Sequence, residues 1–240
     1  MVCVPATDKG AATRELILDH AYAIASKKGI EGISIGDLAQ SVGMSKSGVF
    51  AHFGSREEMQ LALLDKVGRG FGEAVFIPAL RKPRGLPRLR AIVSGWFDWA
   101  LDNRDGCPIM GAVSEYDSRP GPQRDRVVAL LAQWRAELAR AINLAVEVGE
   151  LAPSTDAQQL VFEIFGVAFA LHHDVRLFDP KRARQQADRA IDRLLHANTV
   201  QANAVQTNAV RASTAQANAL HANAVRANAI ATATRNSPRK

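Results

Sequence analysis

The segment of residues 34–53, SIGDLAQSVGMSKSGVFAHF, constrains the fold more than any other part of the chain. Ser34 stands before an apolar helical pattern and is followed three residues later by Asp37, which is typical of a capped helix start. Gly43 ends this pattern, and Ser45 caps a second short helix almost at once. The segment therefore predicts two short capped helices joined by a glycine turn, a helix-turn-helix.

The second of these helices begins with small polar and basic residues, Ser45, Lys46, Ser47 and Gly48. A helix N-terminus built from such residues can approach a nucleic-acid groove closely. Its free N–H groups and positive dipole end favour phosphate. The ammonium group of Lys46 can reach a guanine edge or a phosphate. This pattern predicts contact with double-stranded DNA.

The rest of the chain also favours helices, with no alternating strand runs. A helical pattern begins at Thr13 and stops at Gly29, and Ser55 with Glu58 opens a helix that reaches about Arg69 or beyond. A later helix is expected to have Pro87 in its first turn and to end before the break at residues 105–108, and others are expected in the segments 109–116, 123–148, 156–177 and 180–196. We predict an all-α chain of about nine helices, the first four closely spaced and the last five longer.

The N-terminal quarter of the chain resembles the tetracycline-repressor (TetR/AcrR) family. The residues that carry the resemblance are Thr13, Gly29, the segment 34–39, Gly43, the segment 45–48, Phe50, His52, Phe53 and the segment 55–58. The resemblance implies a flexible arm over residues 1–12 and a three-helix DNA-binding domain with its connecting helix over 13–70. It also implies a helical-bundle domain for effector binding and dimerisation over residues 71–196.

The resemblance also implies roles for individual residues. Lys46, Ser47 and Gly48 stand where the family's recognition helix meets base edges. Phosphate contacts are expected from four residues, Ser34, Ser45, His52 and Arg56. Gly36 stands where some members carry a base-reading side chain, so the set of base-reading residues is short.

Two phenylalanines of this segment have competing interpretations. Phe50 occupies the place usually held by tyrosine, and it has no hydroxyl group to donate to a phosphate. An apolar contact with a thymine methyl group and a place in the core are both open for Phe50. For Phe53 we favour the core of the three-helix domain.

The function that the resemblance implies is a cytoplasmic, homodimeric, ligand-responsive regulator, most simply a repressor of a pseudo-palindromic operator. The helices 156–177 and 180–196 are expected to form the dimer interface, because residues 160–171 are apolar on almost every side. Effector binding is expected to move the helix 55–70. Two alternatives stay open: an all-α small-molecule-binding protein without specific DNA binding, and an interaction protein whose C-terminal tail is the working part.

The expected effector is a small molecule of unknown identity, and no cofactor is expected. Aromatic and flexible side chains of the second domain are candidates for its pocket, namely Trp96, Met110, Trp134, Phe165 and Phe169. The sequence does not separate the residues of a pocket wall from those of the core.

Enzymes and metal proteins are poor interpretations of this sequence. It contains no nucleophile–base pair, phosphate-binding loop or metal-ligand spacing. His172 and His173 are adjacent, so on a helix their side chains diverge and a structural role is favoured over a metal site. With two cysteines, Cys3 and Cys107, a disulfide framework is excluded, although Cys107 could act as a thiol sensor. No signal peptide or membrane span is expected.

The positive charge of the chain lies mostly outside the expected DNA-binding domain. The formal net charge is +6, of which residues 1–80 contribute −1, residues 81–196 contribute +2 and residues 197–240 contribute +5. The last segment consists of five-residue units such as QANAV and RANAI. We expect a low-complexity, largely disordered tail over 197–240, while a pentapeptide-repeat module and a partly helical extension are the alternatives.

Overall fold

A computed structural model describes residues 6–200 and residues 214, 216 and 218. Every regular element among these residues is helical, which confirms the predicted all-α class. The elements are α1 (Ala6–Lys28), α2 (Ile35–Ser41), α3 (Lys46–Phe53), α4 (Arg56–Phe71), η1 (Gly72–Phe76), α5 (Ile77–Ala79), α6 (Leu86–Asp102), α7 (Pro108–Tyr116), α8 (Pro122–Glu147), α9 (Ala157–Leu177) and α10 (Pro180–Ala197).

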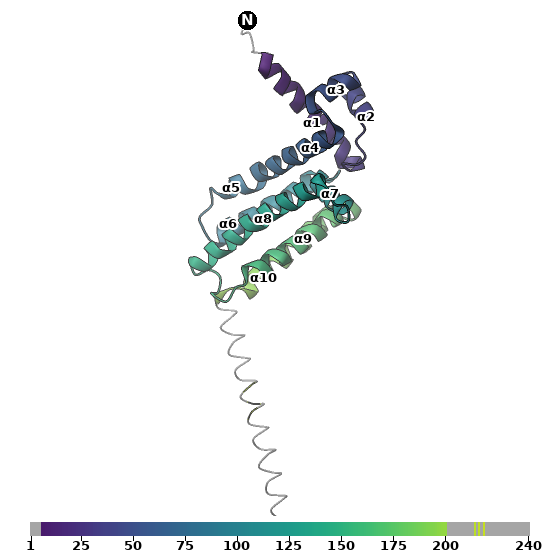
Figure 1. The fold of residues 1–240 in the computed structure, drawn as a ribbon. Helices are drawn as coiled ribbons and strands as arrows, with labels where there is room; N and C mark the ends of the chain where they lie inside the picture. The colour runs from purple at the N-terminus through teal and green to yellow at the C-terminus, as the bar shows by residue number, and fades with distance from the viewer. Residues whose placement is uncertain (1–5, 201–213, 215, 217, 219–240) are drawn as a thin grey trace, which may run out of the picture.

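Helices α1, α2 and α3 form a small domain above a bundle made by the later helices (Figure 1). Apolar side chains from all three helices fill the core of this domain, among them Ile17, Leu38 and Val49. Phe53 is buried there as expected, and the guanidinium carbon of Arg14 lies 4.9 Å from the centre of its ring. Burial of these side chains holds the two helices of the helix-turn-helix in a fixed orientation.

The first helix begins earlier than predicted. Residues 6–12 were expected to belong to a flexible arm, but α1 begins at Ala6. This stretch is rich in alanine, the residue with the highest helix propensity. The Thr13 hydroxyl also donates a hydrogen bond to the Lys9 carbonyl, 2.9 Å away. The arm expected over residues 1–5 lies outside the described residues.

The connecting helix continues well beyond Arg69, as the sequence allows. It continues from α4 through a wide π-helical turn, η1, into α5, so the chain stays helical from Arg56 to Ala79. The expected domain boundary at residues 70 and 71 therefore falls inside a continuous helix. With α4, η1 and α5 counted as one, the described residues form nine helices, the predicted number.

The second domain is a bundle in which α8 packs against α4, α6, α7 and α9. One side of α8 is buried, with Val127, Trp134, Leu138 and Ile142 facing the core. Helices α9 and α10 pack closely on each other at the edge of the bundle (Figure 1). Their outer face carries apolar side chains that no other described residue covers, and Phe162 is 65% exposed.

The C-terminal tail lies almost entirely outside the described residues, so the expectations for it stay predictions. Helix α10 ends at Ala197, as the sequence indicates. Thr214, Gln216 and Asn218 are helical and exposed. Among the helices that the structure describes, none is both long and apolar enough to cross a membrane.

Candidate DNA-binding and effector-binding sites

A serine caps the start of each helix in the helix-turn-helix. The Ser34 hydroxyl accepts a hydrogen bond from the Asp37 N–H at 3.0 Å, and the Ser45 hydroxyl accepts one from the Gly48 N–H at 3.1 Å. Both caps were predicted from the spacing of the residues. The second cap fixes the N-terminus of α3, whose other free N–H groups point along the helix axis toward solvent.

The first turn of α3 is open to solvent. Ser45, Lys46 and Ser47 are exposed, and Gly48 is half-buried. Phe50 is 45% exposed, which favours the surface interpretation over the core one. The exposed side chains on the first turns of α3 therefore form a surface of small, basic and aromatic groups.

The side chain of Lys46 lies across the start of α2. A Cβ atom added to Gly36 would stand 3.2 Å from Cε and 3.5 Å from Nζ of Lys46. Gly36 therefore leaves the space in which the lysine stem rests. The Ser34 hydroxyl oxygen borders the same space, 3.7 Å from the added Cβ atom.

His52 and Arg56, two of the residues predicted to contact phosphate, also lie against other parts of the chain. His52 is half-buried in the last turn of α3. Arg56 binds the loop between α1 and α2: its Nε donates to the Ile33 carbonyl at 3.0 Å, and one terminal nitrogen donates to the Glu31 carbonyl and carboxylate at 2.6 and 3.1 Å. The structure thus gives Arg56 a role in holding this loop. Its phosphate contact stays a prediction.

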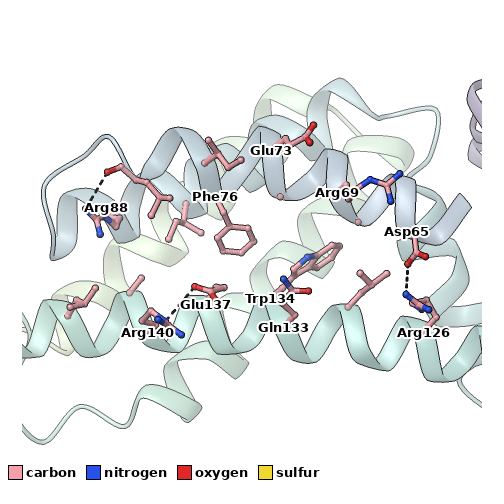
Figure 2. Close-up of a pocket in the computed structure, with 18 residues that line it drawn as sticks. Asp65, Arg69, Glu73, Phe76, Arg88, Arg126, Gln133, Trp134, Glu137 and Arg140 are labelled. Carbon is pink, nitrogen blue, oxygen red and sulfur yellow. Dashed lines mark hydrogen bonds and ion pairs between the residues drawn. The ribbon is translucent and has the colours of Figure 1, made fainter. Parts of the chain in front are cut away.

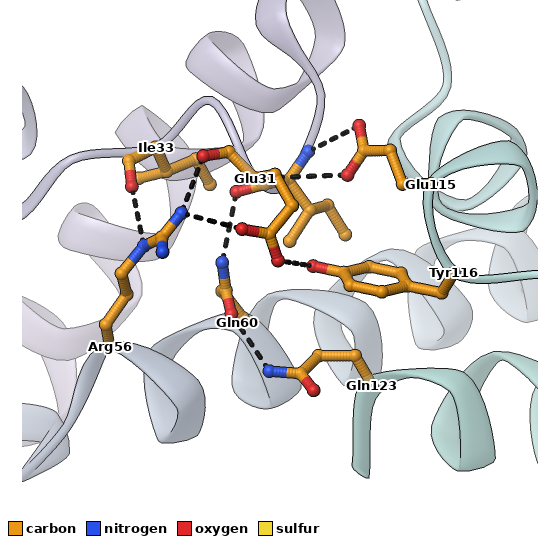
Figure 3. Close-up of polar contacts among 8 residues, drawn as sticks. Glu31, Ile33, Arg56, Gln60, Glu115, Tyr116 and Gln123 are labelled. Carbon is orange, nitrogen blue, oxygen red and sulfur yellow. Dashed lines mark hydrogen bonds and ion pairs between the residues drawn. The ribbon is translucent and has the colours of Figure 1, made fainter. Parts of the chain in front are cut away.

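The same loop is held from the other side by α7 (Figure 3). The Glu115 carboxylate accepts hydrogen bonds from the N–H groups of Ile30 and Glu31 at 3.1 and 3.0 Å. The Tyr116 hydroxyl donates to the Glu31 carboxylate at 2.6 Å. This hydrogen bond, assisted by Arg56, lowers the pKa of Glu31. Burial, together with the negative charge of Glu31, raises the pKa of Tyr116.

A buried amide connects α8 to the same loop through α4. Gln60 is 2% exposed, and its amide nitrogen donates to the Ile30 carbonyl at 3.2 Å. Its amide oxygen accepts a hydrogen bond from Gln123, in the first turn of α8, at 3.0 Å (Figure 3). We call the contacts of Glu31, Arg56, Gln60, Glu115, Tyr116 and Gln123 around this loop the junction network. The sequence interpretation did not identify it.

A cavity of about 580 Å³ lies between the connecting helix and α8. Phe76 and Trp134 point into it from opposite sides (Figure 2). The lining comes from α4 and α8, the η1–α5 segment and the start of α6. Such a volume is typical of small-molecule sites. At one end, Arg126 of α8 pairs with Asp65 of α4 at 2.6 Å.

One of the five predicted pocket residues lines this cavity. Trp134 lines it, whereas Trp96, Met110, Phe165 and Phe169 do not. Trp96 and Phe165 are core residues with ring centres 4.7 Å apart. Met110 and Phe169 are half-buried and pack on that core. Contact of these four residues with an effector stays a prediction, since aromatic and flexible side chains fill a core as readily as they line a pocket.

Of the candidate sensor residues, Cys107 and His172 are buried and His173 is exposed. Burial raises the pKa of the Cys107 thiol and lowers the pKa of His172 to about 4. His172 faces the core while its neighbour His173 is exposed, and their ring centres lie 5.8 Å apart in an edge-on contact. Within the described residues, no group of three or more His, Cys, Asp or Glu side chains could hold a metal ion.

Two family models match the chain. Residues 17–63 match the model of bacterial regulatory proteins of the tetR family, and residues 85–191 match the tetracyclin repressor-like C-terminal domain. These ranges contain the helix-turn-helix and most of the bundle. No match is found among curated proteins.

Solved structures of similar proteins cover most of the chain. A TetR transcriptional regulator from Chloroflexus aurantiacus is 24% identical, with a TM-score of 0.70 over 79% of this chain and 96% of that one. The regulator PfmR from Thermus thermophilus is 25% identical, with a TM-score of 0.60 over 76% and 95%. AibR, solved with isovaleryl coenzyme A and operator DNA, is 21% identical, with a TM-score of 0.60 over 72% and 95%.

Proposed function

Because the chain belongs to the TetR family of bacterial regulatory proteins, we propose that it is a ligand-responsive regulator that represses transcription from a pseudo-palindromic operator. The exposed first turn of α3 carries this proposal. There, Lys46 and Ser47 stand beside a capped helix N-terminus with free N–H groups. We place the protein in the cytoplasm, where its operator DNA is found.

The proposed DNA contacts divide into two kinds. Lys46, Ser47 and Gly48 read base edges in the major groove, and the exposed ring of Phe50 meets a thymine methyl group. Ser34, Ser45, His52 and Arg56 contact phosphates and set the register of the protein on the duplex. Ser34 and Ser45 combine capping with phosphate contact, since a hydroxyl group both accepts and donates.

The outer face of α9 and α10 is the proposed dimer interface. Phe162 and Val167 of α9 and Leu194 of α10 lie on this face, together with small residues such as Gly166 and Ala170. Small residues let two such faces approach closely, and burial of the exposed apolar side chains supplies the driving force. A two-fold dimer places the two recognition helices about one turn of DNA apart.

The cavity between α4 and α8 is the proposed effector site. The Asp65–Arg126 pair at its end stands on the same two helices as the Gln60–Gln123 hydrogen bond, about one turn further along each. A ligand that moves α4 away from α8 would break this hydrogen bond and free the Ile30 carbonyl from Gln60. The loop before α2 would then shift, and the DNA-competent population would fall. AibR, which has the same fold, was solved in complex with isovaleryl coenzyme A and operator DNA, so a protein of this fold can hold both kinds of partner.

Selection from random double-stranded DNA with the purified full chain tests the proposal. The expected result is a sequence with two inverted half-sites whose centres are about ten base pairs, or a multiple of this, apart. In mobility-shift assays on that sequence, Lys46→Ala should weaken binding by about tenfold to a hundredfold, through loss of a base or phosphate contact. Lys181→Ala, which removes an exposed charge from α10, is the matched control and should leave the affinity unchanged.

Two results would overturn the proposal. One is selection without any enriched sequence. The other is equally weak binding by the native protein and Lys46→Ala on every DNA tested. Either would favour an all-α ligand-binding or interaction module without specific DNA recognition.

A further inference from the structure

The cavity between α4 and α8 joins an apolar interior to a cationic end. Phe76 and Trp134 face each other across it, and Leu130 and Leu144 add aliphatic surface from α8. Phe71 packs behind Trp134, with ring centres 4.0 Å apart, so the aromatic wall is fixed in place. An apolar ligand body would replace water along this wall.

Only some of the arginines that line the cavity are paired with a carboxylate. Among the four lining arginines, Arg126 pairs with Asp65 at 2.6 Å and Arg140 pairs with Glu137 at 3.6 Å. The other lining carboxylate, Glu73, is exposed and turned away from α8 (Figure 2). Arg69 and Arg88 have no carboxylate partner among the described residues, so their charges are available to a ligand.

Arg88 is held in place by neutral groups. Its guanidinium donates to the Lys82 carbonyl at 3.0 and 3.3 Å and to the Leu80 carbonyl at 3.3 Å. Carbonyl groups fix the position of a guanidinium without cancelling its charge. Arg81, Lys82 and Arg84 lie in the α5–α6 loop that precedes Arg88 and are exposed. The α5–α6 loop therefore gives one end of the cavity a positive potential, far from the helix-turn-helix (Figure 1).

We propose that this cavity binds an amphipathic anion, whose apolar chain lies along Phe76 and Trp134 and whose anionic group meets Arg88. The proposal rests on the assignment of the cavity as the effector site. It also gives a role to the basic α5–α6 loop, which attracts the ligand to the cavity. Carboxylates, phosphates and sulfates share the required chemistry, because each accepts two hydrogen bonds from a guanidinium.

Calorimetry and tryptophan fluorescence with the full chain, in the absence of DNA, test the ligand class directly. The probes share a chain of about ten carbons and differ in the head group: decanoate, decyl phosphate, decanol and decylammonium. Both anions should bind about tenfold or more tightly than decanol, and decylammonium should bind more weakly still. The relative affinities of decanoate and decyl phosphate show whether the site prefers a carboxylate or a phosphate.

Substitutions then locate the anionic group. Arg88→Gln should remove the preference for anions over decanol, whereas Arg88→Lys should keep most of it because the charge remains. Arg182→Gln removes an exposed charge on α10 outside the cavity and should bind like the native protein. Thermal unfolding of each variant reports whether the α5–α6 loop still supports the fold.

Three outcomes would overturn the proposal: decanol bound as tightly as decanoate, no binding of any probe, or an anion preference that survives Arg88→Gln. Failure of the effector role gives a different result. In that case the anions bind with the expected preference, but operator affinity in mobility-shift assays stays the same when they are added.

Discussion

Gly29 is the residue on which the junction network depends most directly. Its backbone has a φ of +78°, and a Cβ atom added there would stand 1.7 Å from the Glu115 carboxylate oxygen that binds the loop. Gly149 has the same φ of +78°, but an added Cβ atom would meet nothing within 4 Å. The two glycines therefore separate backbone strain from the contact with Glu115.

We predict that Gly29→Ala destabilises the protein more than Gly149→Ala. Both alanines face the strain of a positive φ, about 1–2 kcal/mol. Gly29→Ala also pushes Glu115 off two N–H groups, which should add at least about 1 kcal/mol. Urea unfolding measures both costs. In a Glu115→Ala background, the two glycine substitutions should lower the free energy of unfolding by the same amount. Equal losses in the native background would show that Glu115 does not hold the loop.

Single residues with a local role were predictable, whereas those of the junction network were not. The serine caps at Ser34 and Ser45 follow from spacing, because a cap and its N–H partner are three residues apart. Glu115 and Ile30 are separated by 85 residues in the chain, so no local pattern connects them. Gln60 offered a weak sign, since it is a polar residue directly after the apolar Met59 in a helix with a buried face.

The seam between α4 and α8 is the element that joins the cavity to the junction network. Gln123 of α8 reaches Gln60 of α4, and Gln60 reaches the loop before α2. Both helices also line the cavity. Any change in their separation acts at once on the cavity and on the loop, which is the physical basis of the proposed coupling.

We predict that Gln123→Ala loosens the loop before α2 without unfolding the bundle. Gln60 then loses the hydrogen bond that orients its amide, and its contact with the Ile30 carbonyl weakens. Hydrogen–deuterium exchange should rise in residues 29–53 and stay unchanged in α6. Gln158→Ala, an exposed glutamine at the start of α9, is the control. Faster exchange restricted to the first turn of α8 would contradict the coupling.

At the scale of elements, helix type and number were predictable, while helix length and the cavity were not. Periodicity and caps located the helices, but the alanine-rich residues 6–12 carry no apolar stripe, so periodicity does not reveal that they are helical. The connecting helix continues beyond Arg69 through the π-helical turn Gly72–Phe76, which no sequence pattern indicated. The cavity arises from the spacing of three helices in space, which side-chain type does not reveal.

The distribution of charge over the whole molecule differs from that of a protein that binds DNA by bulk attraction. The basic α5–α6 loop lies at the far end from α3 (Figure 1). The tail contributes a further five positive charges: Arg211, Arg226, Arg235, Arg239 and Lys240. Sequence preference in the proposed regulator therefore depends on α3, while the tail charges add attraction without sequence preference.

We predict that truncation after Val200 keeps the operator preference and lowers the general affinity for DNA. The cut keeps Asn198, whose carbonyl accepts a hydrogen bond from the Ala152 N–H at 2.8 Å. Each tail charge that contacts phosphate contributes up to about 0.9 to the slope of log affinity against log salt. Titrations of operator and random DNA at several salt concentrations should thus give a smaller slope and an unchanged preference. A lost preference would assign recognition to the tail.

The same truncated protein tests whether the tail is needed for dimerisation. It should sediment as a dimer, because the proposed interface on α9 and α10 remains intact. Phe162→Glu places a charge at the centre of that face and should give a monomer with weak operator binding, since each half-site then binds alone. Val128→Glu, at an apolar residue similarly exposed on α8, should remain dimeric. A monomeric truncation product, or a dimeric Phe162→Glu protein, would move the interface away from α9 and α10.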